Sequence, residues 1–184
     1  MATELAGKKL GLLKEAFPQA SRVAVLWNSD VAGMASEYSE TLAAAQALGV
    51  QLQSLPVREP ADLERAYATT SWGGIDALVV LYDIVTGASR ARIAELAATR
   101  RLPAISGDRD YAAAGGLLAY GPKIADMYRR AAAYVDKILK GAKPADLPVE
   151  QPTRFDFVIN LKTAQTLGVT IPSSVLQQAT EIIQ

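Results

Sequence analysis

The 184-residue sequence contains neither cysteine nor histidine. Without these residues the chain has no thiol nucleophile, no disulfide, no Cys/His zinc site and no histidine general base. Catalysis would have to rest on carboxylates, Lys, Tyr or Ser. Cysteine-free chains occur on both sides of a bacterial inner membrane, so the absence does not decide the compartment. We expect no catalytic residue, no metal site and no cofactor, and the carboxylate-based alternatives are weighed below.

The sequence also lacks an excess of charge of either sign. Lys and Arg together number 19, as do Asp and Glu, so the formal net charge at pH 7 is zero. A neutral chain has no long-range positive field to hold phosphate backbones, and we expect no nucleic-acid partner. Half of the residues are apolar, which suffices to bury a core in one domain or one large lobe.

No segment of the sequence predicts export or a membrane span. Residues 1–13 form an amphipathic opening that contains Lys8 and Lys9, and they lack the apolar core and small-residue cleavage site of a signal peptide. We interpret the basic pair Lys8 and Lys9 as part of a solvated helix face.

The order of sequence patterns predicts an α/β fold. β-rich runs alternate with segments of helical periodicity, which indicates a doubly wound, mostly parallel sheet covered by helices on both faces. The run Ile75–Leu81 is continuously apolar, as is typical of a central strand buried on both faces. The predicted strands are 22–27, 50–57, 75–81, 102–105, 116–119 and 154–159, and the predicted helices are 5–17, 32–48, 60–70, 86–100, 109–114, 124–139, 161–167 and 173–183.

Polar and aromatic residues follow four of the predicted strands. Because the carboxyl ends of parallel strands meet at one edge of a sheet, these residues should lie together where α/β proteins bind ligands. Tyrosine at such a place offers a stacking face and a hydroxyl group. The candidate ligand-binding residues are Asn28, Tyr82, Asp83, Ser106 and Tyr120. Each also has a structural explanation as a helix cap, a turn or packing at the solvent edge, and the sequence leaves both interpretations open.

Carboxylates near the same strand ends raise the alternative of a magnesium site. They are Asp30, Asp83, Asp108 and Asp110. Phosphoryl-transfer domains of similar topology need two adjacent acids at one strand end and a Lys at another. Here the first strand ends in Asn28 and no Lys follows a central strand. The sequence also lacks a P-loop and a G-x-G-x-x-G motif, so we expect neither a magnesium nor a nucleotide site.

Segment 124–139 predicts an amphipathic helix whose apolar face is wider than a helix at the edge of one lobe needs. Soluble monomers seldom expose such a face, so we expect a homodimer in which this helix packs against, or exchanges with, its counterpart. The apolar residues are Ile124, Met127, Tyr128, Ala131, Ala132, Tyr134, Val135, Ile138 and Leu139.

A series of short motifs runs through the last third of the chain. They are GGLLAYGP at 115–122, MYRRAA at 127–132, ILKGAKP at 138–144, LPVEQP at 147–152, FDFVINLKTA at 155–164 and LGVTIP at 167–172, with looser matches at 8–10 and 22–28. In this order, and over nearly the whole chain, they resemble the substrate-binding proteins of bacterial ABC importers, in the family whose best-known members take up aromatic amino acids.

The resemblance implies both a fold and a function. Full-length members consist of two doubly wound lobes of the type I periplasmic-binding-protein fold, joined by three crossings, and they close on a small molecule. Carried onto this chain, the resemblance implies that residues 5–119 form the second lobe. The helix at 124–141 would cross to a first lobe, and residues 147–159 would cross back. The hinges would lie at 120–122, where the Pro suits an extended segment that pairs little with a sheet, and at 141–151. The resemblance also implies a solute-binding component, or a fragment of one, with an amino acid as ligand and an ABC permease as partner of the full-length protein.

Full-length members carry an export signal or lipid anchor, which implies a periplasmic or lipid-anchored extracellular location. This sequence shows no such signal, and the resemblance begins where the second lobe begins. We therefore expect a fragment or shortened form that keeps half of a ligand site. Two other classes stay open, namely a stand-alone α/β sensory or interaction domain and a flavodoxin-like enzyme that uses Asp or Tyr chemistry.

Overall fold

One seven-stranded sheet organises the chain. A computed structural model describes residues 2–184, with side chains from residue 5 onward. The strand order is β2-β1-β3-β4-β5-β6-β7, and every neighbouring pair is parallel except β5 and β6. The strands are β1 (Arg22–Asn28), β2 (Gln51–Val57), β3 (Ala77–Val80), β4 (Ala104–Ser106), β5 (Leu118–Pro122), β6 (Phe155–Asn160) and β7 (Glu181–Ile183). The predicted α/β class and mostly parallel sheet are confirmed.

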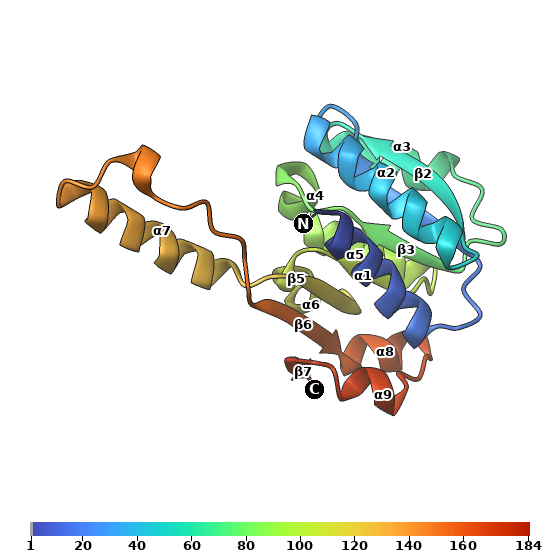
Figure 1. Cartoon of the computed structure of the whole chain (residues 1–184). Coiled ribbons are helices and arrows are strands. Elements are labelled where there is room, and N and C mark those ends of the chain that lie inside the picture. Colours follow the sequence, from blue (N-terminus) through green and yellow to red (C-terminus); the bar gives the residue numbers. More distant parts are fainter. Residues whose placement is uncertain (1) are drawn as a thin grey trace.

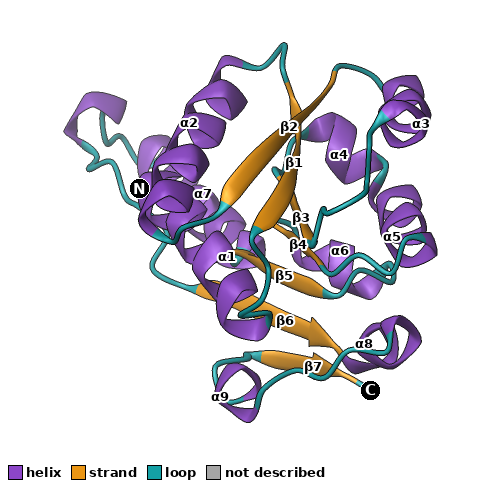
Figure 2. Cartoon of the chain, turned by 90° about the vertical axis from the view of Figure 1, so that its right-hand side faces the viewer, coloured by secondary structure: helices purple, strands orange, loops and turns teal. Residues whose placement is uncertain are grey.

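Helices cover both faces of this sheet (Figure 2). On one face lie α1 (Ala2–Ala16) and α2 (Ala32–Ala47), and on the other lie α3 (Pro60–Thr69), α5 (Arg90–Thr99) and α6 (Arg109–Ala113). Successive residues of β1 face different cores: Val25 packs in the core with α1, and Leu26 packs in the core with α3 and α5. All four residues of β3 are buried, as predicted for a central strand.

Short elements fill the remaining connections. They are α4 (Ile84–Ala88), α8 (Leu161–Leu167), α9 (Ser173–Leu176) and the 3-10 turn η1 (Pro144–Asp146). Local chemistry sets the ends of α8. The Asn160 side chain accepts a hydrogen bond from the Thr163 N–H at 3.0 Å, and Gly168 adopts the left-handed conformation that ends the helix.

Helix α7 (Ile124–Leu139) projects away from the body, with the return segment 142–154 beside it (Figure 1). We call residues 123–154 the arm. None of the side chains of α7 is buried. Its predicted apolar residues are accordingly open to solvent; Tyr128 is 74% and Leu139 is 82% exposed.

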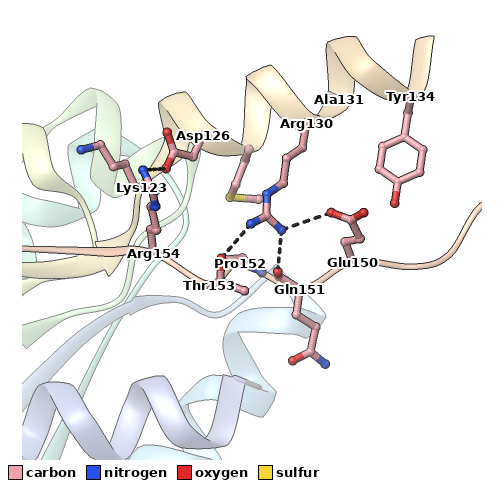
Figure 3. A pocket seen from close by; sticks show the side chains of 11 residues that line it. Lys123, Asp126, Arg130, Ala131, Tyr134, Glu150, Gln151, Pro152, Thr153 and Arg154 are labelled. Carbon is pink, nitrogen blue, oxygen red and sulfur yellow. Dashed lines mark hydrogen bonds and ion pairs between the residues drawn. The ribbon is translucent and has the colours of Figure 1, made fainter. Parts of the chain in front are cut away.

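Side-chain contacts fasten the two limbs of the arm to each other (Figure 3). Arg130 donates to the Glu150 carboxylate and to the Gln151 carbonyl, each at 3.2 Å, and to Thr153 Oγ1 at 2.7 Å. The Tyr134 hydroxyl donates to the Pro148 carbonyl at 2.6 Å. A small pocket of about 200 Å³ lies between the limbs. The arm is therefore a helix with its return strand tied along it.

Three expectations about local structure are wrong. The proline-containing segment 120–122 was expected to pair little with the sheet, but it is the end of β5 and pairs with Phe155, Asp156 and Phe157 of β6. The predicted helix 86–100 is two helices, α4 and α5, that meet at Ser89. The predicted helix 173–183 stops at Leu176, since the chain then forms β7 alongside β6, where the Thr180 N–H donates to the Phe157 carbonyl at 2.8 Å.

Among the described residues, no helix combines the length and the apolar character needed to cross a lipid bilayer.

Candidate ligand-binding edge

The carboxyl ends of four neighbouring parallel strands form one edge of the sheet. Val80 of β3 is in register with Leu26 of β1 and with Ser106 of β4, and Ser106 is in register with Ala119 of β5. Asn28 and Ser106 end β1 and β4, Tyr82 and Asp83 follow β3, and Tyr120 lies within β5, one residue beyond Ala119, so the structure brings the five predicted ligand-binding residues to this edge. We call it the strand-end edge.

Asn28 and Asp83 form a direct contact at this edge. Asn28 is only 4% exposed, and its Nδ2 donates to Asp83 Oδ2 at 2.5 Å. Asn28 Oδ1 accepts from the Asp30 N–H at 3.0 Å, which closes a turn after β1. Asp83 also caps α4, since its Oδ1 accepts from the Thr86 N–H at 2.9 Å. Both residues therefore have the structural roles that the sequence left open.

The ionisation of Asp83 follows from these contacts. Partial burial acts to raise the pKa of its carboxyl group, but hydrogen bonds from the Thr86 N–H, the Asn28 amide, the Thr86 hydroxyl and the Val85 N–H outweigh it. The pKa of Asp83 thus lies below its ordinary value. Asp83 therefore carries a negative charge at neutral pH.

The other three candidates differ in how far they reach solvent. Ser106 is 2% exposed, and its Oγ accepts from the Asp108 N–H at 3.2 Å. Tyr82 is 43% exposed, and its ring lies so close to Gly87 that a Cβ there would be 2.6 Å from Cε2. Tyr120 is half-buried and stacks on Phe155 with ring centroids 5.9 Å apart, and burial raises its pKa. Tyr82 is therefore the most accessible of the five.

A groove begins at Tyr82 and runs toward the base of the arm. Its volume is about 440 Å³, and its other lining residues include Asp108, Arg109, Lys123 and Asp156. Several of these charges are paired: Arg109 contacts Glu181, and Lys123 Nζ lies 3.9 Å from Asp156 Oδ1. This volume falls in the range of small-molecule sites, whose linings are usually more apolar.

A second groove, of about 840 Å³, lies along the outer strand β2 and helix α3. Its lining includes Trp27, Ser54, Arg58 and Arg65, and none of the predicted ligand-binding residues. The side chain of Trp27 is held in place by two contacts. The indole stacks on Tyr38 of α2 with centroids 4.9 Å apart, and its Nε1 donates to Ser54 Oγ at 2.8 Å. This groove is larger, but Tyr38 and Ser54 already hold the indole of Trp27, its aromatic lining residue.

The acidic residues of the edge do not form a metal cluster. Asp108 pairs with Arg90 at 2.8 Å, and Asp30 lies 3.3 Å from Arg58. Within the described part of the chain, no group of three or more His, Cys, Asp or Glu residues is placed to hold a metal ion.

The position of Lys9 shows that one interpretation of the sequence, a solvated helix face at Lys8 and Lys9, is wrong for Lys9. Its side chain is only 4% exposed and forms an ion pair with Glu37 of α2, so it is not part of a solvated helix face. A Cβ at Gly107, just after β4, would lie 3.5 Å from Lys9 Nζ. Lys9 is therefore at the strand-end edge, and nothing local in the sequence marks it. Its partner is 28 residues away.

Comparison with known proteins decides the family. The model of the family described as ABC transporter substrate binding protein matches residues 2–183. The chain belongs to this family. None of the curated protein sequences compared with it matches significantly.

Solved structures share the architecture of this chain. A conserved domain protein from Vibrio cholerae has 25% identity and a TM-score of 0.89, over 96% of this chain and 60% of that one. An ABC domain from Streptococcus pneumoniae in complex with L-Trp has 26% identity and a TM-score of 0.88, over 97% and 62%. A ligand-free, open substrate-binding protein from Clostridium difficile, at 21% identity and a TM-score of 0.72 over 96% and 59%, shows the fold alone. The chain thus spans about three fifths of the length of these proteins.

Proposed function

We propose that the chain is a solute-binding component of a bacterial ABC importer, or a part of one, and that it binds an amino acid at the strand-end edge. The observation that carries the proposal is the family match over residues 2–183, together with the convergence of the five candidate residues on that edge. The L-Trp bound by the Streptococcus pneumoniae relative supports an amino acid as ligand. A binding role of this kind needs no catalytic residue.

The side chains of the edge suit the parts of an amino acid. Asp83 is an ionised carboxylate whose unused lone pairs can accept from the ligand's α-ammonium group. Tyr82 offers an exposed aromatic face, and Tyr120, stacked on Phe155, offers a rigid one. Asn28 and Ser106, both buried, position the loops that carry the others.

We further propose that residues 5–119 form one ligand-binding lobe and that α7 crosses to a second lobe in a protein that has one. In that protein the lobes would close on the ligand, and an ABC permease would be the partner. The protein would be periplasmic or lipid-anchored and extracellular. The 184-residue chain alone would supply one wall. A site of about 1 μM, near −8 kcal/mol, would then weaken to about 1 mM, near −4 kcal/mol.

For the 184-residue chain we propose a homodimer through α7. The exposed apolar residues Ile124, Tyr128, Ala131, Val135 and Ile138 follow each other at intervals of four and three residues. This spacing makes one continuous stripe along the helix, as in helices that pair with another helix. A second copy of α7 presents the same stripe, so a two-fold symmetric contact would cover both.

Calorimetric titration tests the proposed function. L-Trp, L-Phe and L-Leu are added at millimolar concentrations to the chain and to variants at the two tyrosines. We expect saturable binding that Tyr82→Ala or Tyr120→Ala weakens about tenfold, because each removes an aromatic wall. The matched variants Tyr82→Phe and Tyr120→Phe keep the ring and should bind nearly as the parent does. Micromolar binding by a monomer that both Ala variants leave unchanged would contradict the proposed site.

A further inference from the structure

Strand β2 is the outermost strand of the described sheet, and only β1 pairs with it. The Gln51 N–H donates to the Ser21 carbonyl at 2.8 Å, and the Val57 carbonyl accepts from the Ser29 N–H at 3.2 Å. Alternate residues of a strand turn their N–H and C=O groups to the same side, so the odd-numbered residues of β2 face β1. The residues whose backbone groups point outward are Leu52, Ser54 and Pro56. We call this outer side the β2 edge.

The position of Pro56 agrees with this alternation. Proline has no N–H group, and in sheets it is found where that group would face solvent. Pro56 also ends the usable edge, because a neighbouring strand would find no donor there. The N–H groups of Leu52 and Ser54 remain available to a strand laid beside β2. An edge of this kind is the template on which an extended peptide adds to a sheet.

Two hollows along the β2 edge leave room for an added chain. One is the groove of about 840 Å³ beside α3, and the other has a volume of about 370 Å³. Both are lined by Gln53 and Ser54, so they adjoin each other along β2, and the smaller one is also lined by Leu52. The outward backbone groups of β2 therefore border open space.

The residues that line the two hollows give this edge a positive charge. The charged ones are three arginines and one carboxylate, namely Arg22, Arg58, Arg65 and Asp62. Asp62 is buried and already accepts from the Arg58 N–H at 2.8 Å and pairs with the Arg65 guanidinium. The side chain of Arg58 is 70% exposed, and its contact with Asp30 joins two exposed groups, which adds little stability. Acidic side chains of a partner would find guanidinium donors here.

The two faces of the sheet differ at the β2 edge. Arg22 is an even-numbered residue of β1, like Ala24 and Leu26, whose side chains lie in the core with α3 and α5. The other two arginines line the groove beside α3. Leu52 instead packs against the core on the side of α1 and α2. A strand beside β2 would place alternate side chains near the arginines and near Leu52, which suits a peptide of alternating acidic and apolar residues.

We propose that the β2 edge binds an extended, acidic peptide segment of a partner protein, which adds to the sheet as a further strand. Backbone hydrogen bonds to Leu52 and Ser54 would hold the segment, and the three arginines would select acidic side chains. None of the five candidate ligand-binding residues lines either hollow. The proposal therefore goes beyond the proposed function and does not depend on it.

Amide hydrogen exchange, measured by NMR with the synthetic peptide Ac-Glu-Val-Glu-Val-Glu-Val-NH2, tests the proposal. We expect exchange at the Leu52 and Ser54 N–H groups to slow about tenfold or more at saturating peptide, because both gain an acceptor. The N–H groups of Gln53 and Leu55 face β1 already and should not change. The peptide with Lys in place of Glu should bind about tenfold more weakly at low salt, because its charge opposes that of the arginines.

A matched pair of variants tests the role of the arginines. Arg58→Gln/Arg65→Gln should bind the acidic peptide about tenfold more weakly, because two cations leave the groove. Lys8→Gln/Lys162→Gln removes the same charge from exposed positions on α1 and α8 and should bind as the parent does. If circular dichroism shows the arginine variant to be unfolded, the Glu and Lys peptides are compared on the parent chain alone. Equal binding of the two peptides would overturn the assignment of an acidic partner.

Other occupants of the edge give other results. Exchange at Leu52 and Ser54 that slows with protein concentration, without peptide, would show that a second copy covers the edge and would overturn the proposal. The proposal also fails if the acidic peptide does not bind, or binds and leaves these two N–H groups unchanged. Each of these results leaves the strand-end edge untouched, because the amino-acid titration tests that site separately.

Discussion

Asn28 and Asp83, which are 55 residues apart in the sequence, are joined by a hydrogen bond of 2.5 Å from Asn28 Nδ2 to Asp83 Oδ2. The contact links the ends of the neighbouring strands β1 and β3. Because Asp83 also caps α4, one carboxylate fixes the turn after β1, the loop after β3 and the start of a helix. Two of the strand-end loops are therefore held in place before any ligand arrives, which lowers the entropy lost on binding.

Replacing Asn28 should destabilise the chain and change how its stability depends on pH. Asn28→Ala removes a donor to a partly buried carboxylate, and we expect a loss of about 1–3 kcal/mol in the free energy of unfolding at neutral pH. Urea unfolding measures it. Gln46→Ala, on the exposed side of α2, is the control and should change little.

The direction of the pH effect follows from the lowered pKa of Asp83. A carboxyl group whose pKa is lower in the folded state adds stability above its unfolded value, about 3.9, and this is lost as the pH falls through the folded-state pKa. Asn28→Ala should raise the folded-state pKa toward the unfolded one, so that less of this stability is present at neutral pH. Urea midpoints that shift equally with pH in variant and parent would contradict this account.

Gly121 allows two backbones to approach each other at the end of β5. A Cβ at this position would lie 2.1 Å from the carbonyl oxygen of Gly107. Gly121→Ala must therefore displace the loop after β4, and we expect a loss of about 3 kcal/mol or more, or failure to fold. Thermal unfolding by circular dichroism measures it.

Gly11 provides the matched control for that substitution. It lies within α1, and a Cβ there would meet nothing within 4 Å. Gly11→Ala should raise stability by about 0.5–1 kcal/mol, because alanine favours a helix over glycine. Equal effects of the two substitutions would show that the approach of Gly121 to Gly107 does not constrain the fold.

The stripe on α7 predicts a dimer that a single charge disrupts. Val135 lies in the stripe and is 55% exposed, so Val135→Glu should place a carboxylate in the contact and give a monomer. Ala133→Glu, on the opposite side of the helix, should leave the dimer intact. Light scattering at micromolar concentration distinguishes the two forms. A monomeric parent chain would contradict the proposed dimer.

Local sequence signals predicted some elements to the residue. Helix 124–139 was predicted with the bounds of α7, because Pro122 precedes it, Gly141 follows it and its apolar residues recur at helical spacing. The bounds of α8 were likewise predicted, with Gly168 at its end. The alternation of predicted strands and helices also predicted that the candidate residues would lie at one edge of a parallel sheet.

Tertiary contacts decided what the sequence could not predict. The C-terminal segment has helical periodicity, but pairing with β6 offers its backbone a better set of hydrogen bonds, so β7 forms instead. Lys9 follows another lysine on an amphipathic helix, and only the packing of α2 shows that it is buried against Glu37. The contact between Asn28 and Asp83 also depends on strand order, which neither residue's neighbours reveal.

The central claim, that the strand-end edge is a ligand-binding wall, is tested most directly by mapping amide chemical shifts during a titration with L-Trp. The account predicts that the largest shifts fall on Asp83, Gly107 and Tyr120 and on the backbone around them, with saturation at about millimolar ligand for the chain alone. Shifts confined to the β2 groove around Ser54 and Arg65, or to the arm pocket around Arg130, would contradict it.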